Sequence, residues 1–123
     1  MSNHQIVHVE IAALEPAKAG SFYADLFGWQ TVSMPVEGYG EYHTFTTEGG
    51  MTGGFPKTDG QGTHPGDVVV YVSTDDIDES LAKATSLGAT TLMPKSEISG
   101  MGWIGIFKDP TGNKVGLWTG LPQ

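Results

Sequence analysis

The feature that most constrains the fold is a repeat: one order of predicted elements, β-α-β-β-β, occurs twice in 123 residues. Alternating and amphipathic patterns predict the first copy at residues 6–13, 16–27, 29–34, 41–47 and 51–55. After a stretch rich in glycine and proline, the order starts again at residues 67–74, 76–87, 89–93, 102–107 and 114–118. A repeat of this kind supports an architecture more strongly than any single predicted strand does.

The two predicted helices begin and end with recognisable local signals. Pro16 suits the first position of the first helix, and Gly28 suits the position just after its end. Asp76 followed by Glu79 matches a capping box at the start of the second helix. Around the first helix we expect these apolar residues to be buried: Ala19, Phe22, Tyr23, Leu26 and Trp29.

The repeat also predicts how the elements pack. One copy alone would leave a face of its sheet uncovered, whereas two copies can gather their helices on one side. We therefore predict an α+β fold of two βαβββ modules in tandem, forming a curved mixed sheet with the helices on its convex side. Residues 1–123 would be one domain, with module one at 4–56, a linker at 57–66 and module two at 67–120. A small-molecule pocket would lie on the concave side.

The composition excludes several classes of function. All six basic residues are lysines, and 14 acidic residues bring the net charge to -8. Nucleic-acid binding is not expected, because no basic surface is available to neutralise phosphates. The chain has no cysteine, which excludes disulfides and thiolate chemistry. No apolar run reaches membrane length and no signal peptide is recognisable, so we expect a cytoplasmic protein that does not bind membranes.

Several short motifs follow one another in a characteristic order. A His-x-Glu strand lies at His8 to Glu10, FYADLFGW begins at Phe22, DPTGN begins at Asp109, and a GLW strand begins at Gly116. This set resembles the vicinal oxygen chelate superfamily, which includes glyoxalase I, bleomycin-resistance proteins and extradiol dioxygenases. Within it, the chain looks most like the bacterial group related to lactoylglutathione lyase. The resemblance implies a small-molecule ligand and a homodimer.

The resemblance also implies metal-ligand positions in the first and last strand of each module. His8 matches the first position, whereas Gly53 and Gly116 match the last-strand positions and supply no side-chain donor. In the second module the candidates are Asp67 and Val69. A tight divalent site normally uses three or more protein ligands. The expectation is an incomplete metal site with His8 as its one firm ligand and no cofactor, and a bound divalent metal is the less favoured alternative.

His8 and Glu10 are the candidate catalytic residues. They lie two positions apart on a predicted strand and therefore point to the same face, while Val7, Val9 and Ile11 would face the helices. An imidazole beside a carboxylate can act as a general base or bind a ligand hydroxyl or amine. A structural pair is the alternative. The predicted ligand-binding residues are Tyr42, Asp67, Val69, Tyr71, Trp103 and Trp118.

These observations predict a glyoxalase-like or bleomycin-resistance-like small-molecule-binding protein. If it is an enzyme, we expect lyase or isomerase chemistry with Glu10 or His8 as the base. Glutathione is disfavoured as a co-substrate, because no arginine is present to bind its carboxylates. One alternative is an antibiotic-sequestering protein without catalysis, whose acidic charge would attract a cationic drug. Others are a metal-dependent glyoxalase or dioxygenase with atypical ligands, and a regulatory role without chemistry.

Overall fold

The computed structural model describes residues 4–36, 40–59, 63–98 and 100–120. Contacts divide the chain into two compact units, which we describe separately. The first unit is residues 8–69, and the second is residues 70–123 together with residues 1–7. Backbone hydrogen bonds from the His4 amide to Ser73 and from the Ser73 amide to Gln5 hold the N-terminal residues to the second unit. The predicted module boundaries, 4–56 and 67–120 with a linker at 57–66, stay predictions.

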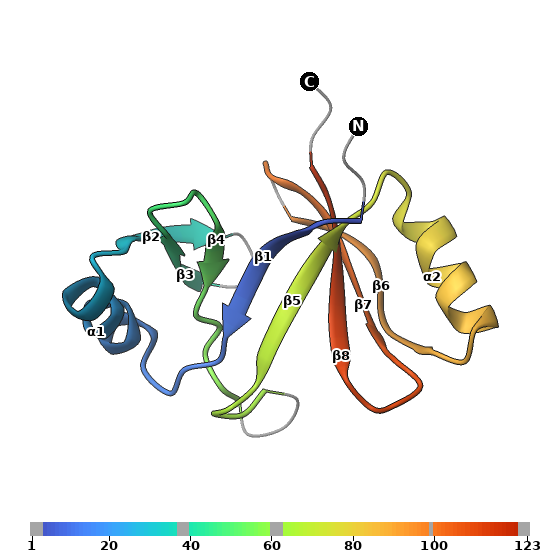
Figure 1. The fold of residues 1–123 in the computed structure, drawn as a ribbon, viewed down its shortest axis with the longest axis horizontal. Helices are drawn as coiled ribbons and strands as arrows, with labels where there is room; N and C mark the ends of the chain where they lie inside the picture. Colours follow the sequence, from blue (N-terminus) through green and yellow to red (C-terminus); the bar gives the residue numbers. More distant parts are fainter. Residues whose placement is uncertain (1–3, 37–39, 60–62, 99, 121–123) are drawn as a thin grey trace. The chain divides into compact units, whose positions relative to one another are not determined.

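The first unit packs one helix on a mixed sheet (Figure 1). Its elements are β1 (Ile6–Ile11), α1 (Pro16–Phe27), β2 (Gln30–Val36), β3 (Gly40–Thr46) and β4 (Thr52–Gly54). The strands lie in the order β2-β3-β4-β1. Strand β3 is antiparallel to both β2 and β4, and β4 is parallel to β1. The core lies between α1 and the sheet, where it is formed by Ala13, Phe45 and Phe55 with Ile11, Ala19, Tyr23 and Trp29.

The buried face of α1 is narrower than the sequence pattern predicts. Ala19 and Tyr23 pack on the core as expected, and Gly20 is buried close to the side chain of Thr31. Phe22 and Leu26 are 56% and 57% exposed, so the prediction that they are buried is wrong. The sheet covers the ridge formed by positions 19, 20 and 23. Phe22 and Leu26 lie four residues apart on the neighbouring ridge, which the sheet of this unit does not reach.

Both predicted helix boundaries are confirmed, but the capping box is only half formed, because the backbone N–H of Asp76 donates to Thr74 Oγ1 and not to the Glu79 side chain. Gly28 ends α1 in the left-handed region with φ of 75°, and its N–H donates to the carbonyl oxygen of Ala24. The carboxylate of Asp76 accepts a hydrogen bond of 3.0 Å from the backbone N–H of Glu79 at the start of the second helix. Local side-chain and backbone preferences therefore set both boundaries.

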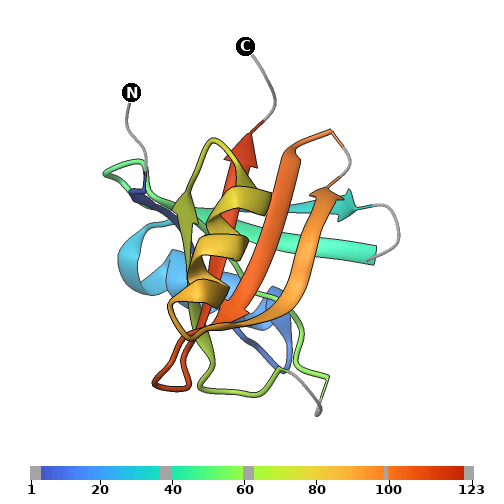
Figure 2. The same cartoon turned by 90° about the vertical axis from the view of Figure 1, so that its right-hand side faces the viewer.

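The second unit repeats the same plan. Its elements are β5 (Val68–Ser73), α2 (Ile77–Ser86), β6 (Thr90–Ile98), β7 (Gly102–Lys108) and β8 (Lys114–Gly120). The strands lie in the order β5-β8-β7-β6, with β5 parallel to β8 and the later pairs antiparallel. Ile77 and Leu81 of α2 are buried against Leu117 of β8, and Figure 2 shows the helix lying against the strands of its unit. The α+β class and the tandem βαβββ order are confirmed.

Strand β6 is the largest departure from the predicted boundaries. It extends over nine residues to Ile98, well past the predicted end at Met93. It pairs with β7 through two register shifts, and Pro94 lies within the second of them. Proline is tolerated there because β6 is the last strand in the order and the shifts remove the need for a regular donor. Among the described residues, neither helix is long and apolar enough to cross a membrane.

Candidate functional site

The pleat of the first sheet separates a core face from the face opposite α1. Ile11 packs in the core under α1. Since strand side chains alternate, His8 and Glu10 point to the opposite face, as predicted. The register of β1 with β4 pairs His8 with Thr52 and Glu10 with Gly54. We call this side of β1 to β4, which carries these four residues, the site face.

A chain of hydrogen bonds joins side chains on the site face. The Tyr42 hydroxyl donates to Glu10 Oε2 at 2.6 Å. His8 Nε2 lies 3.1 Å from the same hydroxyl oxygen, and His8 Nδ1 lies 3.0 Å from Thr52 Oγ1. Tyr42 comes from β3 and Thr52 from β4, whereas His8 and Glu10 share β1. The sheet therefore brings together groups that are far apart in the sequence.

Gly54 makes room for the Tyr42 side chain. A Cβ atom at position 54 would collide with the hydroxyl oxygen and the ring of Tyr42. Any other residue at this position would therefore force the phenol away from its place between His8 and Glu10. The Tyr42 side chain therefore packs directly against the backbone of β4 at Gly54.

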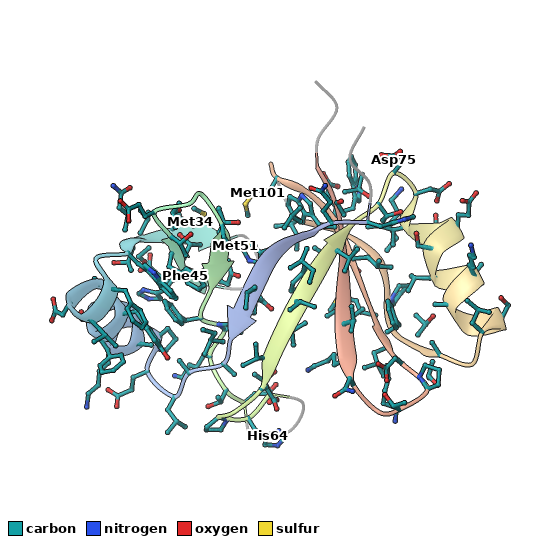
Figure 3. All side chains as sticks on the ribbon, viewed as in Figure 1. Met34, Phe45, Met51, His64, Asp75 and Met101 are labelled. Carbon is teal, nitrogen blue, oxygen red and sulfur yellow. The ribbon has the colours of Figure 1, made fainter. Side chains whose placement is uncertain are left out.

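Met34 borders this site on the neighbouring strand. It pairs with Tyr42 in the register of β2 with β3, so the two side chains share a face. Phe45 points the other way, into the core under α1; both residues are labelled in Figure 3. Val32 lies two residues before Met34 on the same side and is 56% exposed. The polar network therefore lies beside apolar side chains that a ligand can contact.

The electrostatic environment favours an uncharged His8. Burial lowers the pKa of the His8 imidazole from 6.5, because removal from water penalises the charged form. The negative charge of Glu10 acts in the opposite direction and is the smaller effect. At neutral pH, His8 is therefore a neutral ring with one donor nitrogen and one acceptor nitrogen.

The described residues do not fit a divalent metal site. No three His, Cys, Asp or Glu side chains among them are grouped so that they could hold a metal ion. The prediction that Gly53 stands at the ligand position of the last strand needs correction, because Gly53 pairs with Val9 and faces Phe45 in the core. The residue opposite Glu10 is Gly54, and the Tyr42 phenol fills the space beside it.

The aromatic candidates in the second unit lie on different faces of its sheet. Trp103 packs with the core cluster under α2, which includes Leu117. Tyr71 pairs with Gly116 on the other face, where a Cβ at position 116 would collide with the Tyr71 ring. Trp118 alternates with Leu117 and shares the face of Tyr71. Trp103 is only partly buried in this cluster, and its role in ligand binding stays a prediction.

Asp67 and Val69 also have identifiable structural environments. The Asp67 carboxylate accepts a 2.8 Å hydrogen bond from the backbone N–H of His64 and lies 3.7 Å from His64 Nδ1. It thus closes the turn that precedes β5. Val69 is buried, on the same side of β5 as Tyr71. Neither residue takes part in the hydrogen bonds that link His8, Tyr42 and Glu10.

Thr52 and Gly54 are the site residues that sequence reasoning missed. The alternation around His8 and Glu10 is visible in the sequence, and Tyr42 is among the predicted ligand-binding residues. The pairing of β1 with β4 is not visible, because it joins residues more than forty positions apart. The glycine-rich run after Thr52 was the available signal, since glycine in a strand often marks a close approach of another group.

Comparisons with known proteins agree with this fold. A family model described as a glyoxalase-like domain matches residues 8–118. CFP32 of Mycobacterium bovis, provisionally named a glyoxylase, is 30% identical over 118 residues, which cover 89% of this chain and 43% of the relative. The anthracycline biosynthesis protein DnrV of Streptomyces peucetius is 26% identical over 122 residues, which cover 89% of this chain and 44% of the relative. The chain thus spans less than half the length of these relatives.

Solved structures with lower sequence identity share this fold. Methylmalonyl-CoA epimerase from Mycobacterium tuberculosis superposes with a TM-score of 0.69 at 17% identity, covering 95% of this chain and 88% of that one. The Streptomyces coelicolor methylmalonyl-CoA epimerase, in complex with 2-nitronate-propionyl-CoA, gives a TM-score of 0.66 at 18% identity, covering 98% of this chain and 100% of that one. At these identities the likeness concerns the fold alone.

Proposed function

This chain belongs to the glyoxalase-like domain family of the vicinal oxygen chelate superfamily, as its motifs predicted, and we propose that its site face binds a small organic molecule for proton transfer to Glu10. The observation that carries the proposal is the short Tyr42–Glu10 hydrogen bond beside the neutral imidazole of His8. A carboxylate held in place by a phenol is suited to accept a proton from a ligand. The apolar border formed by Val32 and Met34 supports an organic ligand.

The proposed reaction is a lyase or isomerase step. The C–H bond next to a ligand carbonyl breaks, its proton moves to a Glu10 oxygen, and its electron pair delocalises into the carbonyl as an enolate. In an isomerisation Glu10 returns the proton to a carbon atom, whereas in a lyase reaction the electron pair expels a leaving group. Tyr42 holds the Glu10 carboxylate, and His8 holds Tyr42. The glyoxylase name of the Mycobacterium bovis relative supports this class of chemistry.

No step of the proposed reaction passes through a metal ion. His8 and Glu10 are two candidate ligands, whereas a tight site normally needs three or more. The phenol of Tyr42 already links these two side chains, and the described residues offer no third His, Cys, Asp or Glu side chain beside them. The complete metal set implied by the superfamily resemblance therefore does not fit these residues.

Solvent exchange measured by NMR tests the proposal directly. The protein is incubated in D2O with α-ketoaldehyde–thiol adducts or with methylmalonyl-CoA, and deuterium entry next to the carbonyl is followed. We expect the wild-type protein to catalyse exchange on at least one ligand class and Glu10→Gln to lose the activity, since the amide cannot accept the proton. Exchange at the wild-type rate in Glu10→Gln would remove Glu10 from the mechanism.

Antibiotic sequestration without catalysis is the second candidate. It is favoured by the net charge of -8 and by similarity to an anthracycline biosynthesis protein, because an acidic protein attracts cationic ligands. Binding of a cationic aromatic drug, with no deuterium exchange on any ligand, would favour this function over proton transfer. Cytoplasmic location and a homodimer stay predictions.

A further inference from the structure

We propose that Thr52 is a positioning residue which, together with Tyr42, holds His8 in the neutral tautomer that carries its hydrogen on Nε2. The hydrogen bonds that link these four side chains then all point one way, from Thr52 through His8 and Tyr42 to Glu10. A catalytic role for these hydrogen bonds rests on the proposed function, whereas the tautomer of His8 does not. Thr52 lies outside the set of site residues expected from the sequence.

The Tyr42 hydroxyl has a single hydrogen. This hydroxyl donates to Glu10 Oε2 at 2.6 Å, a length typical of an O–H donor to a carboxylate. Its only hydrogen is therefore used. Toward His8 Nε2, at 3.1 Å, the same oxygen can act only as an acceptor. The hydrogen between them must consequently belong to Nε2.

The other ring nitrogen of His8, Nδ1, contacts Thr52. A neutral imidazole that carries its hydrogen on Nε2 has a lone pair on Nδ1, which needs a donor. Thr52 Oγ1 lies 3.0 Å from His8 Nδ1 and has a hydrogen to give. Strand register places Thr52 directly beside His8, and the branched threonine side chain has restricted χ1 freedom. Thr52 is therefore the donor that completes this tautomer.

Thr52 influences Glu10 through the two side chains between them. Without a donor at Thr52, the tautomer with hydrogen on Nδ1 is no longer disfavoured, and its bare Nε2 would compete with Glu10 for the Tyr42 hydrogen. The hydrogen bond from Tyr42 to the Glu10 carboxylate would then weaken. Loss of one hydrogen bond shifts such an equilibrium by about fivefold. Thr52 thus acts on Glu10 only through His8 and Tyr42, which makes it a positioning residue.

NMR on protein labelled with ¹⁵N-histidine tests the proposal. Long-range ¹H–¹⁵N spectra recorded near pH 8 distinguish the protonated ring nitrogen, and His8→Gln assigns the His8 signals. We expect hydrogen on Nε2 in the wild type, a mixture of tautomers in Thr52→Val, and recovery in Thr52→Ser. Thr46→Val is the matched control, because Thr46 pairs with Thr52 on the same face; it should leave the His8 pattern unchanged.

The proposal is overturned if wild-type His8 carries its hydrogen on Nδ1, or if Thr52→Val leaves the pattern unchanged. Should Thr52→Val not fold, Tyr42→Phe provides a second measurement. It removes the acceptor for Nε2–H and should also lower the preference for this tautomer. Deuterium exchange separates the two hypotheses. Wild-type exchange in Glu10→Gln together with the expected tautomers would refute the proposed function and leave the role of Thr52 intact.

Discussion

Gly54→Ala is the sharpest test of how the site is built. The added methyl group would collide with the ring and the hydroxyl of Tyr42, so the phenol must leave its place. Its departure breaks the charge-assisted hydrogen bond to Glu10, a cost of about 1.5–3 kcal/mol. It also removes the contact with His8, a further cost of about 0.5–1.5 kcal/mol. We expect a loss of roughly 2–4 kcal/mol in the free energy of unfolding.

Chemical denaturation monitored by tryptophan fluorescence measures this loss, and Tyr42→Ala shows whether the collision is its cause. In a Tyr42→Ala background the methyl group meets no phenol, so the second substitution should cost less than about 1 kcal/mol. Gly49→Ala is the control, because among the described residues nothing except its chain neighbours lies within 4 Å of an added Cβ, and its effect should stay within about 1 kcal/mol. An equal cost of Gly54→Ala with and without the Tyr42 ring would refute the reasoning.

Three further predictions concern pH, a helix end and assembly. The pKa of His8 is lowered in the folded state, so the unfolded state binds the proton more readily. The contribution of His8 to the free energy of unfolding is therefore fully present above pH 6.5 and is lost as the pH falls below it. Thermal melts from neutral pH downward should show this fall, and His8→Gln should reduce it. Gly28→Ala, at a φ of 75°, should cost about 1 kcal/mol in denaturant titrations. If exposed Phe22 and Leu26 lie in the predicted homodimer interface, Phe22→Ser with Leu26→Ser should halve the mass measured by light scattering.

The parts of the fold that are predictable from sequence are those set by neighbouring residues. Gly28 ends a helix because a left-handed residue is needed there, and Asp76 begins one because its carboxylate accepts a hydrogen bond from Glu79. Repetition of these local signals in both halves predicts the element order. Phe22 was misjudged because helical periodicity shows that a side is apolar without showing how far the sheet reaches.

The site was only partly predictable, because its geometry depends on strand register. Alternation alone placed His8 and Glu10 on one side, and they lie there. Which β4 residue stands beside them depends on the pairing of distant segments, and a shift by one residue exchanges the two faces. That shift separates Gly53, which faces the core, from Gly54, which faces Tyr42.

This difference changes the meaning of a glycine at a site position. Considered by itself, a glycine where relatives of the superfamily place a ligand signifies a lost donor. At Gly54, however, the missing side chain adds a functional group to the site, because it leaves space for the Tyr42 phenol to reach His8 and Glu10. The hydroxyl then joins an imidazole to a carboxylate through hydrogen bonds whose direction follows from the single hydrogen of the phenol. A strand glycine in such a site is therefore best interpreted together with the largest side chain that could occupy its empty space.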